Sequence, residues 1–158
     1  MLFRSFAIGR AGLAAVQRVR DGRGPATSLA VPGLDPATLY GSPTLVDDVA
    51  RFAPQVFAAA SQGDQVAADI VRSAALDLAE TITTALAHLP ESAAPERVLV
   101  ALTGGLFRAG EALLSPLRSA LPGRAELVQS AGSPLDGAAR LATGPPGPYA
   151  DLVSIHRF

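Results

Sequence analysis

The chain has 158 residues, 49% of them hydrophobic and 17% charged, which suits one globular unit with a single core. Its 13 arginines and 14 acidic residues are spread along the sequence, so no basic stripe is available to bind a nucleic acid. Lysine and cysteine are absent, which excludes a Walker-type lysine, a Schiff base, a thiolate nucleophile and a cysteine-ligated metal.

The sequence also argues against a membrane partner. No apolar run approaches about 18 residues, and Met1 to Phe6 lack a long apolar core followed by a small-residue cleavage site. We therefore expect a cytoplasmic protein without nucleic-acid or membrane partners.

Helices are predicted for most of the chain before Pro90. Apolar residues spaced to share one helical face predict the first helix over about residues 8–20. Thr44 is a predicted N-cap for residues 45–50, and Pro54 suits the first turn of a following helix because its missing amide is harmless there.

The most clearly patterned element is a long helix. Asp64 follows a helix-stopping glycine and is predicted to cap a helix that reaches about Leu89. Its apolar residues recur at steps of three or four and predict a buried stripe, which comprises Val66, Ile70, Ala74, Leu78, Ile82 and either Leu86 or Leu89.

The second half of the chain predicts an α/β arrangement. Residues 97–103 are continuously apolar and β-prone, which is typical of a parallel strand covered on both faces. The paired glycines Gly104 and Gly105 should then turn the chain into a helix that continues to about Leu121. A second strand over residues 125–129 and a short helix over residues 134–142 complete the pattern.

The end of the chain is predicted to be a linker and tail. Residues 145–158 begin with a run rich in proline and glycine and include a predicted short edge strand at residues 152–155. Two strands cannot form a sheet that buries a strand on both faces, so we expect further strands that would precede residue 1.

The turn after the first strand is the candidate functional site. Open α/β sheets bind ligands at the carboxyl ends of their strands, where a turn without side chains lets the backbone approach the ligand. Gly104 and Gly105 could adopt positive φ angles and lie flat against a purine or ribose. The pair is not the spaced-glycine dinucleotide fingerprint, and a plain strand-to-helix turn remains the alternative interpretation.

The order of several short motifs resembles the carboxyl lobe of N-acetylglucosamine kinases in the BadF/BadG/BcrA/BcrD ATPase family, of the actin, hexokinase and Hsp70 superfamily. The likeness covers nearly the whole chain. The motifs that carry it are Ile8-Gly9-Arg10, Asp21-Gly22-Arg23-Gly24, Ala53-Pro54-Gln55-Val56, Ala59-Ala60-Ser61-Gln62-Gly63-Asp64, Gly104-Gly105, Asp136-Gly137-Ala138 and Leu152-Val153-Ser154-Ile155-His156.

The resemblance implies an incomplete ribonuclease-H-like, actin-like ATPase lobe, helix-rich with a small and largely parallel sheet. Residues 1–158 would form this single carboxyl-terminal lobe, with the amino-terminal lobe absent. By the resemblance, Thr103, Gly104 and Gly105 contact the nucleotide. Their neighbours Leu106, Phe107 and Arg108 are candidate further contacts.

The implied ligands are ATP and Mg²⁺, the metal being held through the missing lobe and the ATP phosphates. The family's phosphate-binding hairpin and catalytic aspartate lie upstream of the matched region, so we expect neither catalytic nor metal-binding residues here, and no phosphoryl transfer by this chain alone. An amino-sugar substrate would bind only with the other lobe. A homodimer stays open, since such kinases often dimerise.

Two alternatives remain. The chain could be a non-catalytic remnant or interaction module of the same fold, which the missing strands favour. Activators of acyl-CoA dehydratases or reductases belong to the same family, but they hold an iron–sulfur cluster through cysteines, and this chain has none.

Other polar residues have structural interpretations. Asp64 and Asp136 are predicted helix caps, and His88 is predicted to interact with carbonyls at a helix end. The remaining residues weighed for chemistry lack a partner in the sequence that would make them a site: Asp47, Asp48, Ser61, Ser133 and His156.

Overall fold

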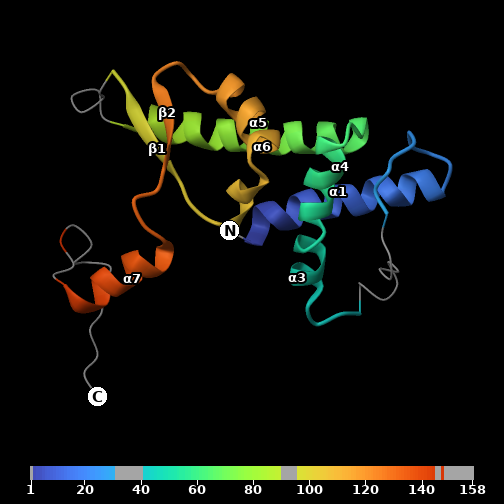
Figure 1. The fold of residues 1–158 in the computed structure, drawn as a ribbon, viewed down its shortest axis with the longest axis horizontal. Coiled ribbons are helices and arrows are strands. Elements are labelled where there is room, and N and C mark those ends of the chain that lie inside the picture. The colour runs from blue at the N-terminus through green and yellow to red at the C-terminus, as the bar shows by residue number, and fades with distance from the viewer. Residues whose placement is uncertain (1, 31–40, 90–95, 145–146, 148–158) are drawn as a thin grey trace.

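A computed structural model describes residues 2–30, 41–89, 96–144 and 147 (Figure 1). The helices and strands in chain order are α1 (Leu2–Arg20), α3 (Leu45–Ala50), α4 (Ala53–Ser61), α5 (Gln65–Ala87), β1 (Val98–Leu102), the 3₁₀ helix η2 (Gly105–Ala109), α6 (Glu111–Ala120), β2 (Ala125–Gln129) and α7 (Pro134–Thr143). The edge strand predicted at residues 152–155 lies outside the described residues. No helix in the described ranges is long and apolar enough to span a bilayer.

Helix α1 begins at Leu2, earlier than the predicted start near residue 8. The added turns contain neither glycine nor proline, so nothing in the local sequence ends the helix there. They are held by Arg4, whose guanidinium donates a 2.7 Å hydrogen bond to the hydroxyl of Thr81 on α5 and lies 3.6 Å from the carboxylate of Asp77. The predicted stop after Arg20 is confirmed, with Gly22 at φ +68°.

Glycines on α1 allow α3 and α4 to cross it closely. A Cβ atom at Gly9 would lie 1.9 Å from the backbone oxygen of Val49 on α3. At Gly12 it would lie 2.7 Å from the Val56 side chain and 2.9 Å from the ring of Phe52. Side-chain-free positions on α1 therefore set how near the two helices approach.

Helix α5 is the long central helix, and it begins at Gln65 after the predicted cap. Leu86, at the end of the predicted stripe, is buried as expected. The other most buried residues lie one position after the predicted ones, at Ala67, Val71, Ala75 and Ala79. Ile70, Ala74, Leu78 and Ile82 are partly buried against the same core. The shift has a physical reason: α5 packs against α1, α4 and α6, and its alanine-rich stripe permits the closest approach.

The core lies among the helices rather than in the sheet. Its fully buried large side chains are Phe52 and Val56, near and on α4, and Leu113 and Leu117 on α6. Partly buried residues such as Leu127 of β2 pack against this cluster. The sheet is thus attached to a helical core through one face.

Strands β1 and β2 form a two-stranded parallel sheet, as predicted, with Val100 paired to Leu127. Helix α5 passes behind this sheet (Figure 1) and packs against α6. One face of β1 is open within the described residues: Leu99 is 65% exposed, while Val98 and Val100 are half-buried. A continuous apolar run predicts a strand, but it cannot show whether a second layer is present.

The helix predicted from Gly104 to Leu121 is two helices. The 3₁₀ helix η2 ends at Ala109, Gly110 follows it with φ +61°, and α6 starts at Glu111. A residue in this left-handed region cannot continue an α-helix, so the chain changes direction there.

Candidate functional site

The glycine turn lies at the carboxyl end of β1, where it was predicted. Gly104 has φ +100° and ψ 169°, a conformation open to glycine but strained for other residues. Thr103, Gly104 and Gly105 are all exposed, and a Cβ atom at Gly105 would meet nothing within 4 Å. The backbone of this turn is therefore accessible to a flat ligand.

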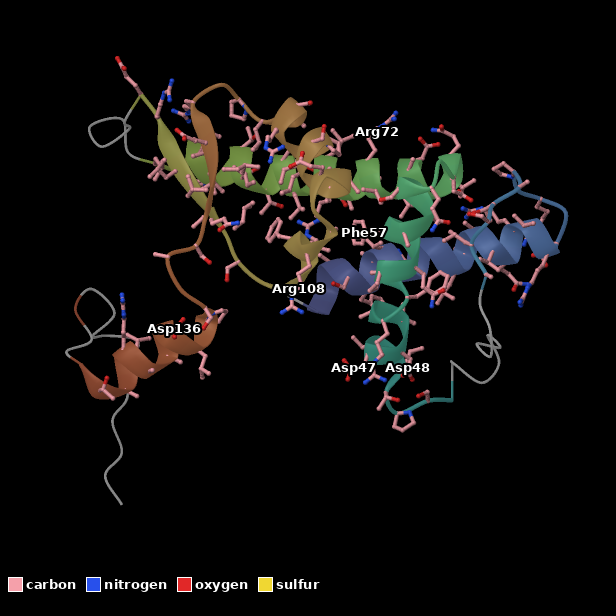
Figure 2. All side chains as sticks on the ribbon, in the orientation of Figure 1. Asp47, Asp48, Phe57, Arg72, Arg108 and Asp136 are labelled. Carbon is pink, nitrogen blue, oxygen red and sulfur yellow. The ribbon has the colours of Figure 1, made fainter. Side chains whose placement is uncertain are left out.

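The three residues that follow the turn face in different directions. Leu106 is buried in the helical core, and Phe107 is partly buried against that core. Arg108 is exposed, and its side chain projects from η2 (Figure 2). Leu106 therefore anchors the turn to the core, whereas Arg108 is the predicted neighbour whose side chain is free to meet a ligand in solution.

The end of β2 lies at the same edge of the sheet. Leu102 pairs with Gln129 in the parallel register, so the residues after both strands emerge side by side. This edge presents the Gly104 turn next to the segment that leads to α7.

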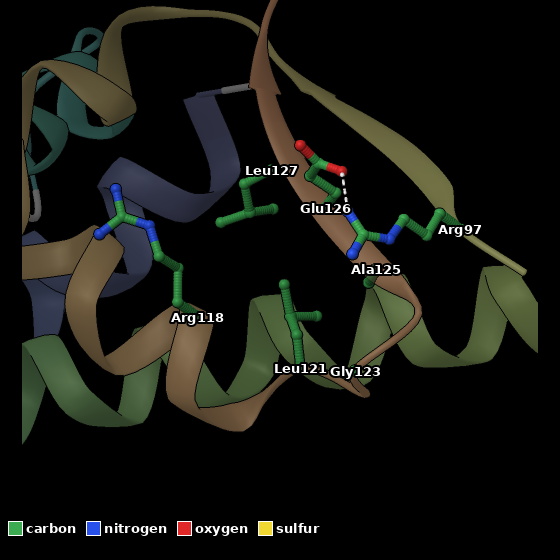
Figure 3. A pocket seen from close by; sticks show the side chains of 7 residues that line it. All are labelled: Arg97, Arg118, Leu121, Gly123, Ala125, Glu126 and Leu127. Carbon is green, nitrogen blue, oxygen red and sulfur yellow. Dashed lines mark ion pairs between the residues drawn. The ribbon is translucent and has the colours of Figure 1, made fainter.

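Two hollows among the described residues lie elsewhere. One of about 430 Å³ lies between α6 and the opposite, amino-terminal end of β2 (Figure 3). Arg97 and Arg118 stand at its two sides, with Leu121 and Leu127 between them. Arg97 lies 3.6 Å from Glu126, and Arg118 makes a bidentate pair with Glu111 at 2.7 and 3.1 Å. Both cations are thus already neutralised by carboxylates.

A second hollow of about 390 Å³ lies between α4, α5 and α6. Its lining is mostly small side chains such as Ala68 and Ala112, with Arg72 and Glu111 among the polar residues. Neither hollow contains Thr103 to Arg108. The predicted site is an exposed turn at the sheet edge that lies outside both hollows.

Asp64 is a structural carboxylate, as predicted. Its Oδ1 accepts a 2.9 Å hydrogen bond from the backbone N–H of Ala67, and its Oδ2 accepts from the hydroxyl of Thr27 and from the N–H and hydroxyl of Ser28. Burial by itself raises the pKa of Asp64, but these hydrogen bonds outweigh it and lower the pKa to about 2. These four hydrogen bonds hold the carboxylate in a structural role, as the cap of α5 and the anchor of the preceding loop.

Asp136 is likewise a cap. Ser133 and Asp136 form a reciprocal capping box at the start of α7, in which the Ser133 N–H donates to Asp136 Oδ2 at 2.6 Å. This backbone hydrogen bond, followed by the one from the Ser133 hydroxyl, lowers the pKa of Asp136. The predicted structural role of Asp136 is confirmed, and the Ser133 hydroxyl serves the same cap.

The other polar candidates also have local partners. His88 Nδ1 lies 2.8 Å from the carbonyl oxygen of Thr84, in line with the predicted helix-end contact, and the Ser61 hydroxyl donates to the Phe57 carbonyl. Asp48 accepts from the hydroxyls of Thr44 and Ser42, which lower its pKa. His156 lies outside the described residues.

Metal ligands do not gather in the described part of the chain. No group of three His, Asp or Glu side chains there is close enough to hold an ion. The described residues around the exposed turn thus offer no carboxylate set for Mg²⁺.

The fold and the turn thus define a helix-rich α/β protein with a ligand-accessible glycine turn at the carboxyl edge of a parallel sheet. The family model of the BadF/BadG/BcrA/BcrD ATPase family matches residues 4–142, and the chain belongs to this family. Membership implies ATP binding. No curated protein and no solved structure gave a significant match.

Proposed function

We propose that this chain is the adenosine-binding, ribonuclease-H-like lobe of an ATP-dependent kinase for an amino sugar such as N-acetylglucosamine. The observation that carries the proposal is the turn at Gly104, which has a positive φ directly after a parallel strand and an exposed backbone on both sides. Membership of an ATPase family supports the nucleotide. The sugar rests on the motif resemblance.

In this proposal the chain binds and orients the nucleoside. The backbone of Thr103 to Gly105 lies against the base and ribose, Leu106 fixes the turn to the core, and Arg108 flanks the ligand. Bound MgATP supplies the transferable phosphoryl group. The groups that hold Mg²⁺ and position the phosphates are expected on the amino-terminal lobe, so the chain alone should bind ATP without phosphorylating a sugar.

Isothermal titration calorimetry with MgATP tests the nucleotide site. We expect saturable binding by the unmodified chain and at least a tenfold weaker affinity for Gly105→Arg, because the new side chain would occupy the ligand's space. Gly123→Arg is the matched control: a Cβ atom there also meets nothing within 4 Å, but Gly123 precedes β2 at the opposite end of the sheet. Circular dichroism verifies that both variants fold.

Two results would contradict the proposal. Equal ATP affinity of the two arginine variants would show that ATP does not bind at the turn. The absence of saturable binding by the unmodified chain would show that the chain does not bind ATP. A separate assay with MgATP and N-acetylglucosamine should yield no phosphorylated sugar from this chain alone. Turnover that Gly105→Arg abolishes would overturn the predicted dependence on a second lobe.

A further inference from the structure

The edge of β2 that faces away from β1 has backbone groups without a strand partner, since β2 pairs with β1 alone in the described residues. The N–H of Val98 donates to the carbonyl oxygen of Arg124, so the next residue, Ala125, directs its backbone away from β1. The Ala125 N–H donates to the carbonyl of Pro122. The groups left at this outer edge are the Ala125 carbonyl, both backbone groups of Leu127 and the Gln129 N–H.

The hollow of about 430 Å³ adjoins the same strand (Figure 3). Ala125 and Leu127 line it from β2, and Leu121 lines it at the end of α6. Arg97 and Arg118 stand at its sides. Because paired residues of neighbouring strands share a face, a strand added to the outer edge of β2 would direct every second side chain toward this hollow.

Residues 152–155 are the segment of this chain whose sequence suits that edge. They lie outside the described residues and beyond the family match, which ends at residue 142. Their sequence, Leu-Val-Ser-Ile, predicts a short edge strand, and the backbone groups of a strand need a neighbour. Of the two free edges of the described sheet, that of β2 adjoins the hollow.

The order of apolar and polar residues in this segment selects a register. With Val153 level with Leu127, the side chains of Val153 and Ile155 share the face of the hollow. The polar Ser154 then takes the other face. A slip by one residue would place Ser154 at the hollow instead, so the pattern favours the first register.

Charge selects the direction of the added strand. In a parallel alignment Asp151 lies level with Ala125, near the guanidinium groups of Arg97 and Arg118. A guanidinium has five N–H donors, and the ion pairs described above leave some of them free. An antiparallel alignment would bring Arg157 to this end of β2 instead, so the parallel one is favoured.

The connection to this segment is short. Residues 144–151 join it to α7 and span up to about 28 Å when extended. No residue of α7 is buried, so packing of that helix does not fix where the connection starts. A short tether gives a local concentration in the millimolar range, which favours the chain's own segment over that of a second copy.

We propose that residues 152–155 add to the sheet as a third strand, parallel to β2 and along its outer edge. The N–H groups of Leu152 and Ser154 donate to the carbonyls of Ala125 and Leu127. The N–H groups of Leu127 and Gln129 donate to the carbonyls of Leu152 and Ser154. All the outer-edge groups of β2 named above are then paired.

Disulfide trapping tests the proposal without background, because the chain has no cysteine. In the proposed register Val128 and Ser154 are neighbours on one face, with Cα atoms about 5 Å apart, a distance that a disulfide bridges. The variant Val128→Cys/Ser154→Cys should form an intramolecular disulfide under mild oxidation at least tenfold faster than Val128→Cys/Val153→Cys, whose second cysteine faces the hollow. Equal rates would overturn the proposal. Predominantly intermolecular disulfides at low protein concentration would overturn it too, in favour of exchange between copies.

Hydrogen exchange gives a second, non-covalent measurement. The N–H groups of Leu127 and Gln129 point away from β1, so their protection reports on the added strand. We expect them to exchange at least tenfold more slowly in the unmodified chain than in Val153→Asp, which places a charge in the hollow. Ser154→Asp is the matched control, and its exchange should resemble that of the unmodified chain because position 154 faces away from the hollow. Fast exchange in the unmodified chain, or equal exchange in the two variants, would refute the added strand.

Discussion

The hydroxyl of Thr27 donates a 2.8 Å hydrogen bond to Oδ2 of Asp64, a residue far along the chain. The same carboxylate caps α5 through the backbone N–H of Ala67. One side chain thus starts the central helix and fastens the loop after α1 to it. Such a cap contributes about 1–2 kcal/mol to the free energy of unfolding.

Removal of this carboxylate should make stability less dependent on pH. The pKa of Asp64 falls from 3.8 to about 2 on folding, so its contribution is present above about pH 4 and is lost as the pH drops toward 2. Urea denaturation at pH 7 should show Asp64→Ala less stable by about 1–2 kcal/mol. The gap should narrow between pH 4 and pH 2; a constant gap would argue against the linkage.

The control for that experiment is Asp69→Ala. Asp69 is an exposed residue of α5 that accepts one side-chain hydrogen bond, from Gln65. We expect a change within about 0.5 kcal/mol at every pH.

Truncation of the helical core should be far more costly than truncation of the surface. Phe52 is 1% exposed, and Phe52→Ala should lower the free energy of unfolding by about 3–5 kcal/mol because a cavity remains. Leu76→Ala, at a residue 53% exposed, should cost much less. Urea unfolding followed by circular dichroism measures both variants. Similar decreases in the free energy of unfolding would show that Phe52 is not part of the core.

Alanine at Gly9 should destabilise the protein although alanine favours helices. Helix propensity alone would stabilise Gly9→Ala by about 1 kcal/mol. The new Cβ would lie 1.9 Å from the Val49 oxygen, and such overpacking typically costs about 1–3 kcal/mol, so the net effect should be a loss. At Gly137, where a Cβ meets nothing, Gly137→Ala should instead increase helical circular dichroism. A stabilising Gly9→Ala would contradict the close crossing of α1 and α3.

Arg124 should stabilise the end of α5 at a distance in sequence. Its guanidinium donates a 3.1 Å hydrogen bond to the carbonyl oxygen of Leu86 in the last turn of the helix. Arg124→Ala should cost about 1 kcal/mol and speed hydrogen exchange near residue 86. Arg97→Ala, which removes an exposed ion pair to Glu126, should change neither measurably.

The elements that could be predicted from sequence are those with local signals. Asp64 could be recognised as a cap because it follows a glycine and precedes an apolar repeat, and the bounds of β2 follow from a short β-prone run. The glycine turn was predictable for the same reason. Glycine readily adopts the positive φ that Gly104 has, so the residue type alone indicated this conformation.

What depends on distant packing could not be predicted. The buried stripe of α5 is set by three partner helices, so periodicity placed all of it except Leu86 one residue away. The exposure of Leu99 depends on what covers the sheet, and an apolar strand looks the same in either case. At the site, Leu106 is buried because it packs into the core around α6, whereas Arg108, two residues later, is exposed. The sequence alone does not show this difference.

Strands β1 and β2 pair only with each other within the described ranges, so each leaves one row of backbone donors and acceptors without a strand partner. Free strand edges are templates for association with other molecules, and here the edge of β1 runs beside the exposed Leu99. A net charge of −1 supplies little colloidal repulsion against such contacts. A concentrated sample should therefore aggregate through the five residues of β1. We expect the substitution Leu99→Lys to slow this aggregation.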